Sequence, residues 1–427
     1  MAVNSGLMKR EILRNCFDEE LKKLYGDDVS VEGQRKRYIS ALESFERLYG
    51  EKSVEIYSAP GRTEVGGNHT DHQNGKVLAA AVDLDAIAVV ARRTDNLIRI
   101  KSEGYQSLEV DLKDIEPCER EIGTTNALVR GMANGMKKRG YQIGGFEAYI
   151  TSDVLTGSGL SSSAAYEVLI GNILSGLYNQ SEVDPITIAQ IGQEAENQYF
   201  GKPCGLMDQM ACSVGGLIFI DFAKAGNPVI KKVSVDFNRF GHSLCIVDTK
   251  GSHADLTDEY ASIPKEMKKV AAYFGKELLC QIAREDFYRQ IPSIRKACGD
   301  RAVLRAMHWF AENDRVDGQT EALEKGDFDE FKGLIKASGD SSYKYLQNVF
   351  AMKNVEEQSI SLALALSDQV LRGKGASRVH GGGFAGTIQA FVPMDMVAEY
   401  KTYMEAVFGN GSCHVLRIRQ DGGIRVM

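Results

Sequence analysis

A glycine-rich turn between a strand and a helix constrains the fold of this chain most. The run "TGSGLSSSAAYEVLIGNIL" begins at Thr156, follows the strand-like "FEAYITSD" and leads into a helical pattern over residues 164–178. Gly157 and Gly159 allow a tight turn and a close approach to a ligand, and three serines occupy the first helical turn. Free N–H groups and the positive dipole end of a helix bind phosphate, so the pattern predicts a phosphate loop.

Other interpretations of this loop are weaker. One serine is enough to cap a helix, so three serines behind two glycines favour a phosphate loop over an ordinary cap. The run is not a Walker A loop, because no lysine follows its glycines. It is not a nucleophile elbow either, because it contains no G-x-S-x-G pattern.

Two further glycine-rich segments indicate ligand loops. "APGRTEVGGNHTDHQNG", residues 59–75, contains hardly any large apolar side chain and four glycines, which is unlike a core strand or an ordinary turn. "RVHGGGFAGTIQAF" places Gly381, Gly382, Gly383 and Gly386 before an apolar strand. Consecutive glycines are typical of places where a chain passes close to another backbone or a ligand.

Strand-like and helical runs are interleaved in both halves of the chain, which predicts an α+β or mixed α/β architecture in two domains. The second domain is expected to begin near residue 235. Residues 8–50 show helical spacing, and we expect two amphipathic helices joined near "GDDVSVEG". At the other end, the "DGG" in "VLRIRQDGGIRV" predicts a hairpin.

Charge and cysteine usage narrow the function classes. The net charge of −7, from 51 basic and 58 acidic residues, argues against a nucleic-acid binder. Eight scattered cysteines without a C-x-x-C pair are typical of reduced thiols in a cytoplasmic protein. The most apolar long run, "VLAAAVDLDAIAVVARR", is interrupted by Asp83 and Asp85, so we expect no membrane segment.

Together, and in this order, "APGR…HTD…G", "GSGLSSSAA" and "GGGFAG" resemble the three motifs of the GHMP kinase superfamily, most closely the galactokinase family. "AENQYFGKPCGLMDQMA" resembles a fourth characteristic run of that family. The resemblance implies a two-domain α+β fold, with a mixed-sheet N-terminal domain (38–234), a ferredoxin-like α/β C-terminal domain (235–427) and the active site in the cleft between them. Residues 1–37 are expected to form a helical extension that lies outside the region of resemblance.

The implied activity is ATP-dependent phosphorylation of the anomeric hydroxyl of a galactose-like sugar. Its implied ligands are the sugar, ATP and Mg²⁺. We expect no nucleic acid or membrane partner, and we expect the protein to be a monomer or a weak dimer. Asp208 matches the catalytic carboxylate and Arg62 the arginine beside it. Ser163 and Glu196 match the two magnesium ligands. The resemblance places ATP on Gly157, Ser158, Gly159, Leu160, Ser161, Ser162 and Ser163.

The residues that match the sugar site are Asn68, His69, Thr70, Asp71 and Tyr260. Several of their neighbours depart from the family pattern. Asn68 stands where a glutamate is usual, residues 72–73 are His-Gln instead of Tyr-Asn, and Glu64 stands where an asparagine is commoner. Gly66 replaces a larger apolar residue, and His380 replaces a threonine in the third motif.

These departures fall on the sugar side of the site, so the identity of the sugar stays open. An amide at residue 68 removes a repulsion against an anionic sugar, and "HTDHQ" is similar to the corresponding run of galacturonate kinases. The resemblance implies galactose as the substrate, converted to galactose 1-phosphate, and the alternatives are galacturonate or another galactose-like sugar. A non-catalytic sensor related to galactokinases is disfavoured, because such sensors are expected to lose residues from the serine run. A metal cluster at His69, Asp71 and His72 is disfavoured, because no further ligand accompanies it.

The phosphate loop gives the first test. A valine at residue 159 adds a branched side chain where the backbone must approach phosphate, so Gly159→Val should abolish ATP affinity. Nucleotide titration calorimetry measures this, and retained affinity would contradict the loop assignment.

Overall fold

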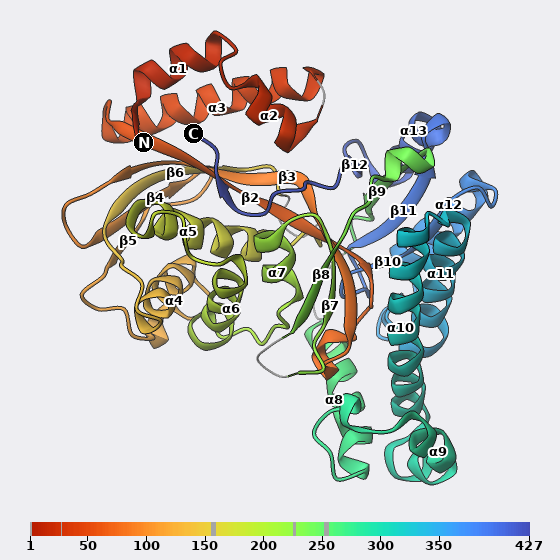
Figure 1. Cartoon of the computed structure of the whole chain (residues 1–427). Helices are drawn as coiled ribbons and strands as arrows, with labels where there is room; N and C mark the ends of the chain where they lie inside the picture. The colour runs from red at the N-terminus through yellow and green to blue at the C-terminus, as the bar shows by residue number, and fades with distance from the viewer. Residues whose placement is uncertain (1, 27, 155–158, 225–227, 252–255) are drawn as a thin grey trace.

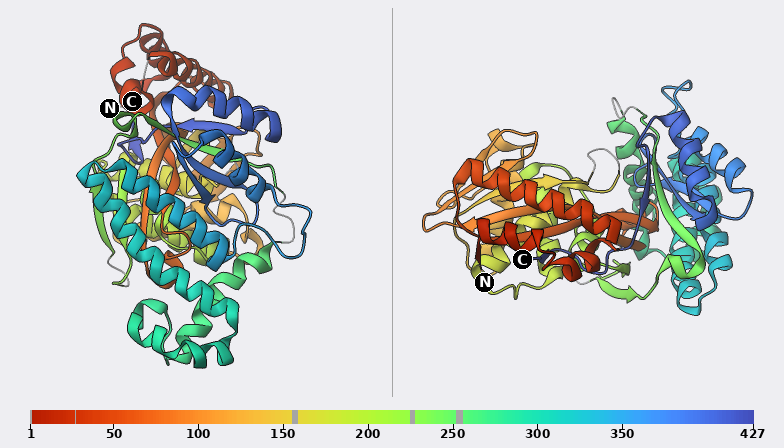
Figure 2. Two further views of the ribbon diagram at one scale, coloured as in Figure 1. Left: turned by 90° about the vertical axis from the view of Figure 1, so that its right-hand side faces the viewer. Right: turned by 90° about the horizontal axis from the view of Figure 1, so that it is seen from above.

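The computed structural model describes residues 2–26, 28–154, 159–224, 228–251 and 256–427. Two α+β domains lie side by side, and the N-terminal helices lie across the outer face of the first domain (Figure 1). The view from above in Figure 2 separates the two domains most clearly. The two-domain α+β prediction is confirmed.

The first domain is built on a mixed sheet of nine strands within the described residues. Its order is β1-β2-β3-β6-β4-β5, with β7 on β3, β8 on β7 and β13 on β2. The pairing of β4 with β6 is parallel and the other pairings are antiparallel. The strands are β1 (Val3–Asn4), β2 (Ser53–Gly66), β3 (Lys76–Arg92), β4 (Leu97–Ser102), β5 (Leu108–Asp111), β6 (Phe146–Ser152), β7 (Leu217–Asp221), β8 (Val229–Val233) and β13 (Ile424–Arg425).

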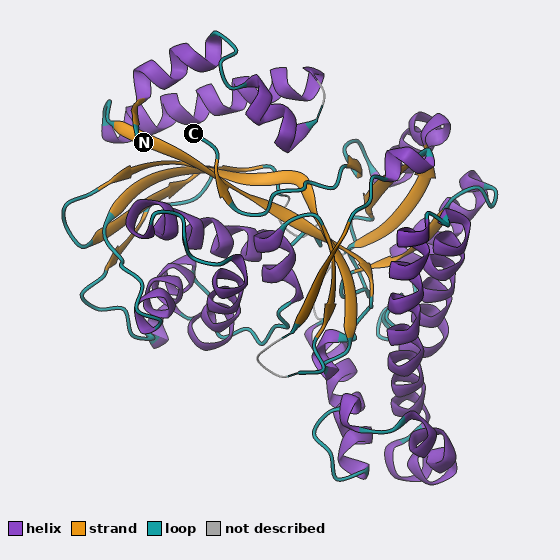
Figure 3. Cartoon of the chain, viewed as in Figure 1, coloured by secondary structure: helices purple, strands orange, loops and turns teal. Residues whose placement is uncertain are grey.

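Helices cover both faces of this sheet (Figure 3). One face packs against α4 (Thr125–Lys138), α5 (Ser162–Asn179), α6 (Pro185–Ala195) and α7 (Met207–Val214). The opposite face packs against α1 (Ser5–Leu13), α2 (Asp18–Tyr25) and α3 (Asp28–Tyr49). In β3, Ala88 and Val90 face the first layer, whereas Ile87 and Val89 face the second. A strand that is buried on both faces reads as a continuous apolar run, which explains this part of the sequence.

The second domain has a four-stranded antiparallel sheet in the order β10-β11-β9-β12. Helices α12 and α13 cover one face, and the other face packs on α11. This is the ferredoxin-like arrangement that the resemblance implied. The elements are α8 (Thr257–Tyr273), α9 (Arg284–Cys298), α10 (Asp300–Lys325), α11 (Phe328–Ser341), α12 (Ser359–Leu371), α13 (Val397–Phe408), β9 (His242–Asp248), β10 (Ala376–His380), β11 (Thr387–Pro393) and β12 (Cys413–Leu416).

Two predictions of local structure were wrong. Residues 8–50 form parts of three helices, because α1 ends at Leu13 and Asn15 turns the chain in the left-handed conformation (φ 61°). A helix junction does lie at the start of "GDDVSVEG", because α2 ends at Tyr25 and α3 begins at Asp28. Helix α3 then continues through residue 37, where the N-terminal extension was expected to end.

Residues 415–426, which are all described, do not form the hairpin that was expected around "DGG". β12 pairs with β9 in the second domain, whereas β13 pairs with β2 in the first. Gly422 is needed for close approach instead of a turn, since a Cβ there would overlap the carbonyl of Ser213. The last residues therefore cross back to the first domain.

Asp83 and Asp85, which interrupt the apolar run of β3, both accept hydrogen bonds from residues 417–419 of the C-terminal segment. Asp85 is fully buried and accepts hydrogen bonds from Tyr25 (2.6 Å), Arg37 (2.6 Å) and Arg419 (3.0 Å). Burial opposes its ionisation, but these two guanidinium groups hold the pKa of Asp85 below its ordinary value. Asp85 thus ties the N-terminal helices, the sheet and the C-terminal tail together.

All eight cysteines lie in the described part of the chain, and each is a free thiol. Across the described ranges, no helix has the length and apolar character that crossing a bilayer requires.

The C-terminal strand provides a stability test. Residues 424–427 add β13 to the sheet, and the backbone of Ile56 bonds to Met427 (2.9 Å) and Val426 (2.7 Å). Their deletion should lower the free energy of unfolding by about 2–4 kcal/mol, through lost strand bonds and exposed apolar surface. Urea denaturation measures this, with the exposed Val407→Ser as a control that stays within about 0.5 kcal/mol. An unchanged midpoint for the deletion would contradict the pairing.

Candidate active site

An ion pair between Arg62 and Asp208 lies at the centre of the site. Arg62 is on β2 next to an irregularity in its pairing with β3, and such bulges redirect side chains. Asp208 is in the first turn of α7. Arg62 Nε donates to Asp208 Oδ1 and Nη2 donates to Oδ2, both at 2.7 Å. The side chain of Asp208 remains 29% exposed, so the carboxylate is fixed yet accessible to a ligand.

The surroundings of Asp208 keep it ionised. Burial acts to raise its pKa, but the charge and hydrogen bonds of Arg62, together with a hydrogen bond from Ser161, lower it below the ordinary value. Ser161 Oγ lies 2.6 Å from Asp208 Oδ2. The position near the N-terminus of α7 also suits a negative charge. Asp208 can therefore act as a proton acceptor across the neutral pH range.

The predicted phosphate loop contacts this pair directly. Arg62 donates through Nη1 to the carbonyl of Gly159, and its backbone N–H donates to Leu160 O (3.0 Å). Ser161 precedes α5 in the left-handed conformation (φ 61°), which is costly for a residue with a side chain and typical of functional loops. Gly157 and Ser158 lie outside the described residues. Leu160 is fully buried, so it offers its backbone and not its side chain.

His380 packs behind the phosphate loop. Gly159 has φ +72°, and a Cβ there would lie 2.8 Å from Thr387 Oγ1 and 3.2 Å from His380 Nδ1. His380 is buried, and its Nε2 accepts the backbone N–H of Glu64 (3.2 Å). Since Nε2 is the acceptor, Nδ1 carries the hydrogen and donates to Thr387 Oγ1 (2.9 Å). His380 therefore joins β2 to the second domain.

The two predicted magnesium ligands also lie together. Ser163 Oγ donates to Glu196 Oε1 at 3.3 Å, and Lys202 Nζ is 3.0 Å from the same oxygen. Glu196 begins a short π-helical turn, Glu196–Phe200, at the end of α6. A hydroxyl and a carboxylate are the hard oxygen donors that magnesium prefers.

Two residues beside these ligands were missed in the sequence. Gln209 donates through Nε2 to Glu196 Oε2 (2.9 Å) and to Glu167 Oε2 (3.0 Å). Glu167 is fully buried, and burial, reinforced by Glu196, raises its pKa. Glu167 is four residues after Ser163 on α5, and side chains at this spacing share a helix face. This spacing could have predicted from the sequence that Glu167 lies beside Ser163.

Asp71 lies next to the run that carries Asp208. A Cβ on Gly205 would overlap the carboxylate of Asp71, so only glycine there permits this approach. The side chain of Asp71 is 12% exposed. Thr70 is fully buried and its hydroxyl donates to Gly67 O (2.8 Å), which shapes the loop. Of these two predicted sugar residues, Asp71 borders the site and Thr70 supports it.

His69 and Tyr260 both contact the third glycine-rich segment. His69 has φ 57°, and its Nε2 donates to Gly382 O at 3.0 Å. Burial, reinforced by nearby His72, lowers the pKa of His69 to about 3, so the imidazole is neutral. Tyr260 donates to Gly383 O (2.9 Å) and packs edge-on against Phe384. Each is partly exposed, so both border the site.

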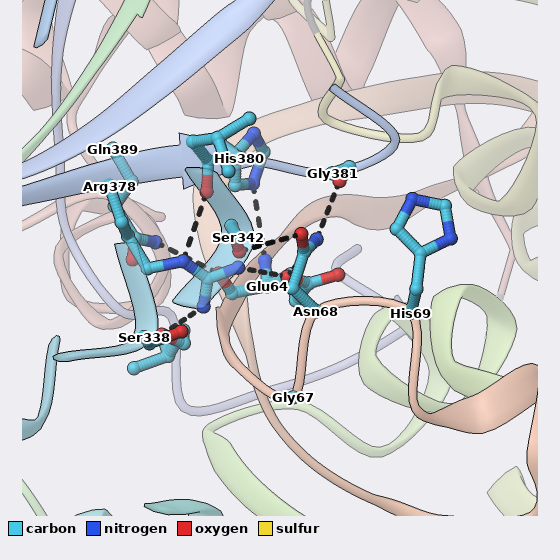
Figure 4. A network of polar contacts seen from close by, with 12 residues as sticks. Glu64, Gly67, Asn68, His69, Ser338, Ser342, Arg378, His380, Gly381 and Gln389 are labelled. Carbon is cyan, nitrogen blue, oxygen red and sulfur yellow. Dashed lines mark hydrogen bonds and ion pairs between the residues drawn. The ribbon is translucent and has the colours of Figure 1, made fainter. Parts of the chain in front are cut away.

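Asn68 is placed differently from the other predicted sugar residues (Figure 4). Its side chain is fully buried, and its Nδ2 donates to Glu64 Oε1 (3.0 Å) and Gly381 O (2.7 Å). Its Oδ1 accepts from Asn348 (2.8 Å) and Ser342 (3.2 Å). Two donors and two acceptor positions are all that a carboxamide has. In this conformation Asn68 has no hydrogen-bonding group left for a sugar.

Helix α10 of the second domain holds the backbone of the sugar loop. His308 Nε2 donates to Asn68 O (2.9 Å), Trp309 Nε1 donates to Thr70 O (3.0 Å), and Glu312 Oε1 accepts from Gly67 N (3.2 Å). The sequence carried little signal for these contacts. Only their spacing on one helical face and the single tryptophan of the chain set these residues apart.

Comparisons with known proteins show which families the chain resembles. Residues 127–216 match the family described as GHMP kinases N terminal domain, and residues 43–92 match the galactokinase galactose-binding signature. The galactokinase of Streptomyces coelicolor is 29% identical over 350 residues, which cover 81% of this chain and 86% of that protein. The galactokinase of Lactococcus lactis subsp. cremoris is 29% identical over 391 residues, covering 89% and 94%.

These matches show a sugar kinase that is similar to the galactokinase family of the GHMP kinase superfamily. A solved structure of the Lactococcus lactis galactokinase complexed with galactose aligns with a TM-score of 0.76 at 25% identity, over 90% of this chain and 98% of that one. The galactokinase-family fold therefore extends over both domains. As a sugar kinase, the protein takes ATP and a sugar as small-molecule ligands.

The role of Arg62 can be tested through pH dependence. A carboxylate that accepts a proton must be ionised. If Asp208 has this role, kcat/KM should fall as the pH drops through the pKa of Asp208, which Arg62 holds down. Arg62→Met should move this acid limb to higher pH and lower kcat by about 10²–10³-fold. Arg62→Lys, which keeps the charge without the paired hydrogen bonds, should shift the limb less. An acid limb that stays in place in Arg62→Met would contradict the assignment.

Proposed function

We propose that this protein transfers the γ-phosphoryl group of ATP to the anomeric hydroxyl of galactose, giving galactose 1-phosphate and ADP. The observation that carries this proposal is the contact among Asp208, Arg62 and Ser161. It joins a proton acceptor, a fixed positive charge and the phosphate loop in a chain that is similar to the galactokinase family. Their proximity is what phosphoryl transfer to a hydroxyl requires.

In the proposed reaction, Asp208 accepts the proton of the sugar hydroxyl while the hydroxyl oxygen attacks the γ-phosphorus. A bond forms between that oxygen and the phosphorus, and the bond from the phosphorus to the oxygen of ADP breaks. Arg62 lies between Asp208 and the carbonyl of Gly159, so its guanidinium faces both the base and the phosphate loop. Its positive charge stabilises the charge of the transferred group and keeps the base ionised.

Ser163 and Glu196 would hold Mg²⁺ together with the phosphates of ATP. Magnesium binds few protein oxygens and keeps several waters, so two ligands are sufficient. When bound, the ion would neutralise phosphate charge. Lys202, 3.0 Å from Glu196, contributes a positive charge of its own to this region.

A neutral sugar is favoured over galacturonate. His69 borders the site as a neutral imidazole, so it provides no positive charge for a sugar carboxylate. Arg62 and Lys202 are already paired with Asp208 and Glu196. An enzyme is favoured over a sensor, because Ser161 and Asp208 are both present and in contact. Free thiols at all eight cysteines, each in the described ranges, support a cytoplasmic location.

A coupled assay over a panel of sugars tests this proposal. The parent protein should form ADP with galactose and several-fold less with galacturonate. Asp208→Asn removes the proton acceptor and should lower kcat by about 10²–10⁴-fold, while ATP still binds. Asp329→Asn alters a carboxylate that is 93% exposed and serves as the matched control. Undiminished turnover in Asp208→Asn would refute the base assignment, and binding of sugar and ATP without turnover in the parent would identify a sensor.

A further inference from the structure

A buried ion pair joins the two domains behind the sugar loop. Glu64 is on β2 of the first domain and Arg378 is on β10 of the second, and their side chains are 4% and 0% exposed. Arg378 donates through Nη2 to Glu64 Oε1 and through Nη1 to Val65 O (2.9 Å), as Figure 4 shows for the pair. One arginine therefore binds β2 both at a side chain and at the backbone.

The stability that this pair provides does not by itself explain why it is there. Removing two charges from water costs about as much as their attraction returns, and apolar residues of similar volume often serve equally well. Burial raises the pKa of Glu64 even against the opposing effect of Arg378, which reflects this cost. A buried pair does, however, require β2 and β10 to keep the positions in which its two side chains meet.

The ion pair controls the side chain of Asn68. Glu64 Oε1 accepts a hydrogen bond from Asn68 Nδ2 as well as from Arg378. The other hydrogen of Asn68 Nδ2 bonds to Gly381 O (2.7 Å), in the glycine run that also binds His69 through Gly382. The position of Glu64 thus sets the orientation of Asn68, and Asn68 sets the separation of the two segments.

The same contacts connect two unusual features of the sequence. Relative to the family pattern, this chain has a carboxylate at residue 64 and an amide at residue 68, where the reverse is usual. In the structure these two side chains bond to each other at 3.0 Å, and Arg378 neutralises the carboxylate. Glu64 and Asn68 are therefore parts of one arrangement, in which the negative charge lies at the domain interface and the sugar loop carries the amide.

We propose that Glu64 and Arg378 are positioning residues for the sugar. Through Asn68 they set the separation between residues 68–71 and the glycine run 381–383, and thereby the affinity for the sugar, without contacting it. The inference rests on the proposed sugar-kinase function, because it assigns the sugar to these two segments.

Steady-state kinetics with the full chain test this inference. Glu64→Gln and Arg378→Met each break the pair, and each should raise the KM for galactose by about tenfold or more while the KM for ATP changes by less than about twofold. Since the two residues act as one unit, the double variant should be no worse than the poorer single variant. Arg378→Lys keeps the charge with fewer hydrogen bonds and should recover part of the affinity.

A matched control separates positioning from stability. The pair between Asp85 and Arg419 is equally buried, with both side chains 0% exposed, but belongs to the first domain. Arg419→Gln should lower the unfolding midpoint and leave the KM for galactose within about twofold of the parent. Ser342→Ala removes only the 3.2 Å hydrogen bond to Asn68 and should raise the KM for galactose by about two- to fivefold even if the ion-pair variants do not fold.

The inference is overturned if the sugar KM stays at the parent value in Glu64→Gln, Arg378→Met and Ser342→Ala. It is also overturned if the KM for ATP rises equally, or if Arg419→Gln raises the sugar KM to the same extent. The proposed function fails differently, in the parent protein, if no sugar is phosphorylated. In that case sugar binding can still be measured in each variant and in the parent, as the change in the unfolding midpoint when galactose is added.

Discussion

The paired hydrogen bonds between Arg62 and Asp208 organise the whole site. They bind the middle of a long strand to the first turn of a helix that lies 146 residues later. The same guanidinium reaches the carbonyl of Gly159, and Ser161 completes the contact by donating to the carboxylate. Strand, helix and phosphate loop can therefore take up their positions only together. The negative charge of Asp208 would be unfavourable alone in a partly buried place, and its pairing with Arg62 both stabilises it and fixes its position.

The sugar loop is a shared element of both domains. Its backbone belongs to the first domain, yet His308, Trp309 and Glu312 of the second domain bind it. His69 and Ser161 hold left-handed conformations at a cost of about 1–3 kcal/mol each. Such conformations persist only where surrounding contacts enforce them, and α10 supplies these contacts for the sugar loop. The geometry of the sugar loop therefore depends on how the two domains pack against each other.

The sequence predicted the parts of the site that depend on local patterns. Arg62, Ser163 and Asp208 lie in segments with distinctive spacing, and the structure brings all three segments together. The burial of Asn68 was not predictable, because it depends on partners such as the carbonyl of Gly381, which is 313 residues away in the sequence. The prediction of a hairpin around "DGG" was wrong for the same reason, because the turn residues carry no information about β2, the distant strand that β13 joins.

The return of the C-terminal tail to the first domain has a consequence for synthesis on the ribosome. Domains usually fold as they emerge, with the N-terminal one first. Here, β13 and the charge of Arg419 beneath Asp85 arrive more than 330 residues after the strands they complete. We therefore expect Tyr57 and Ser58 of β2 to lack their β13 partner until the second domain has been translated. Nascent chains stalled before residue 419 should depend more on chaperones than released ones.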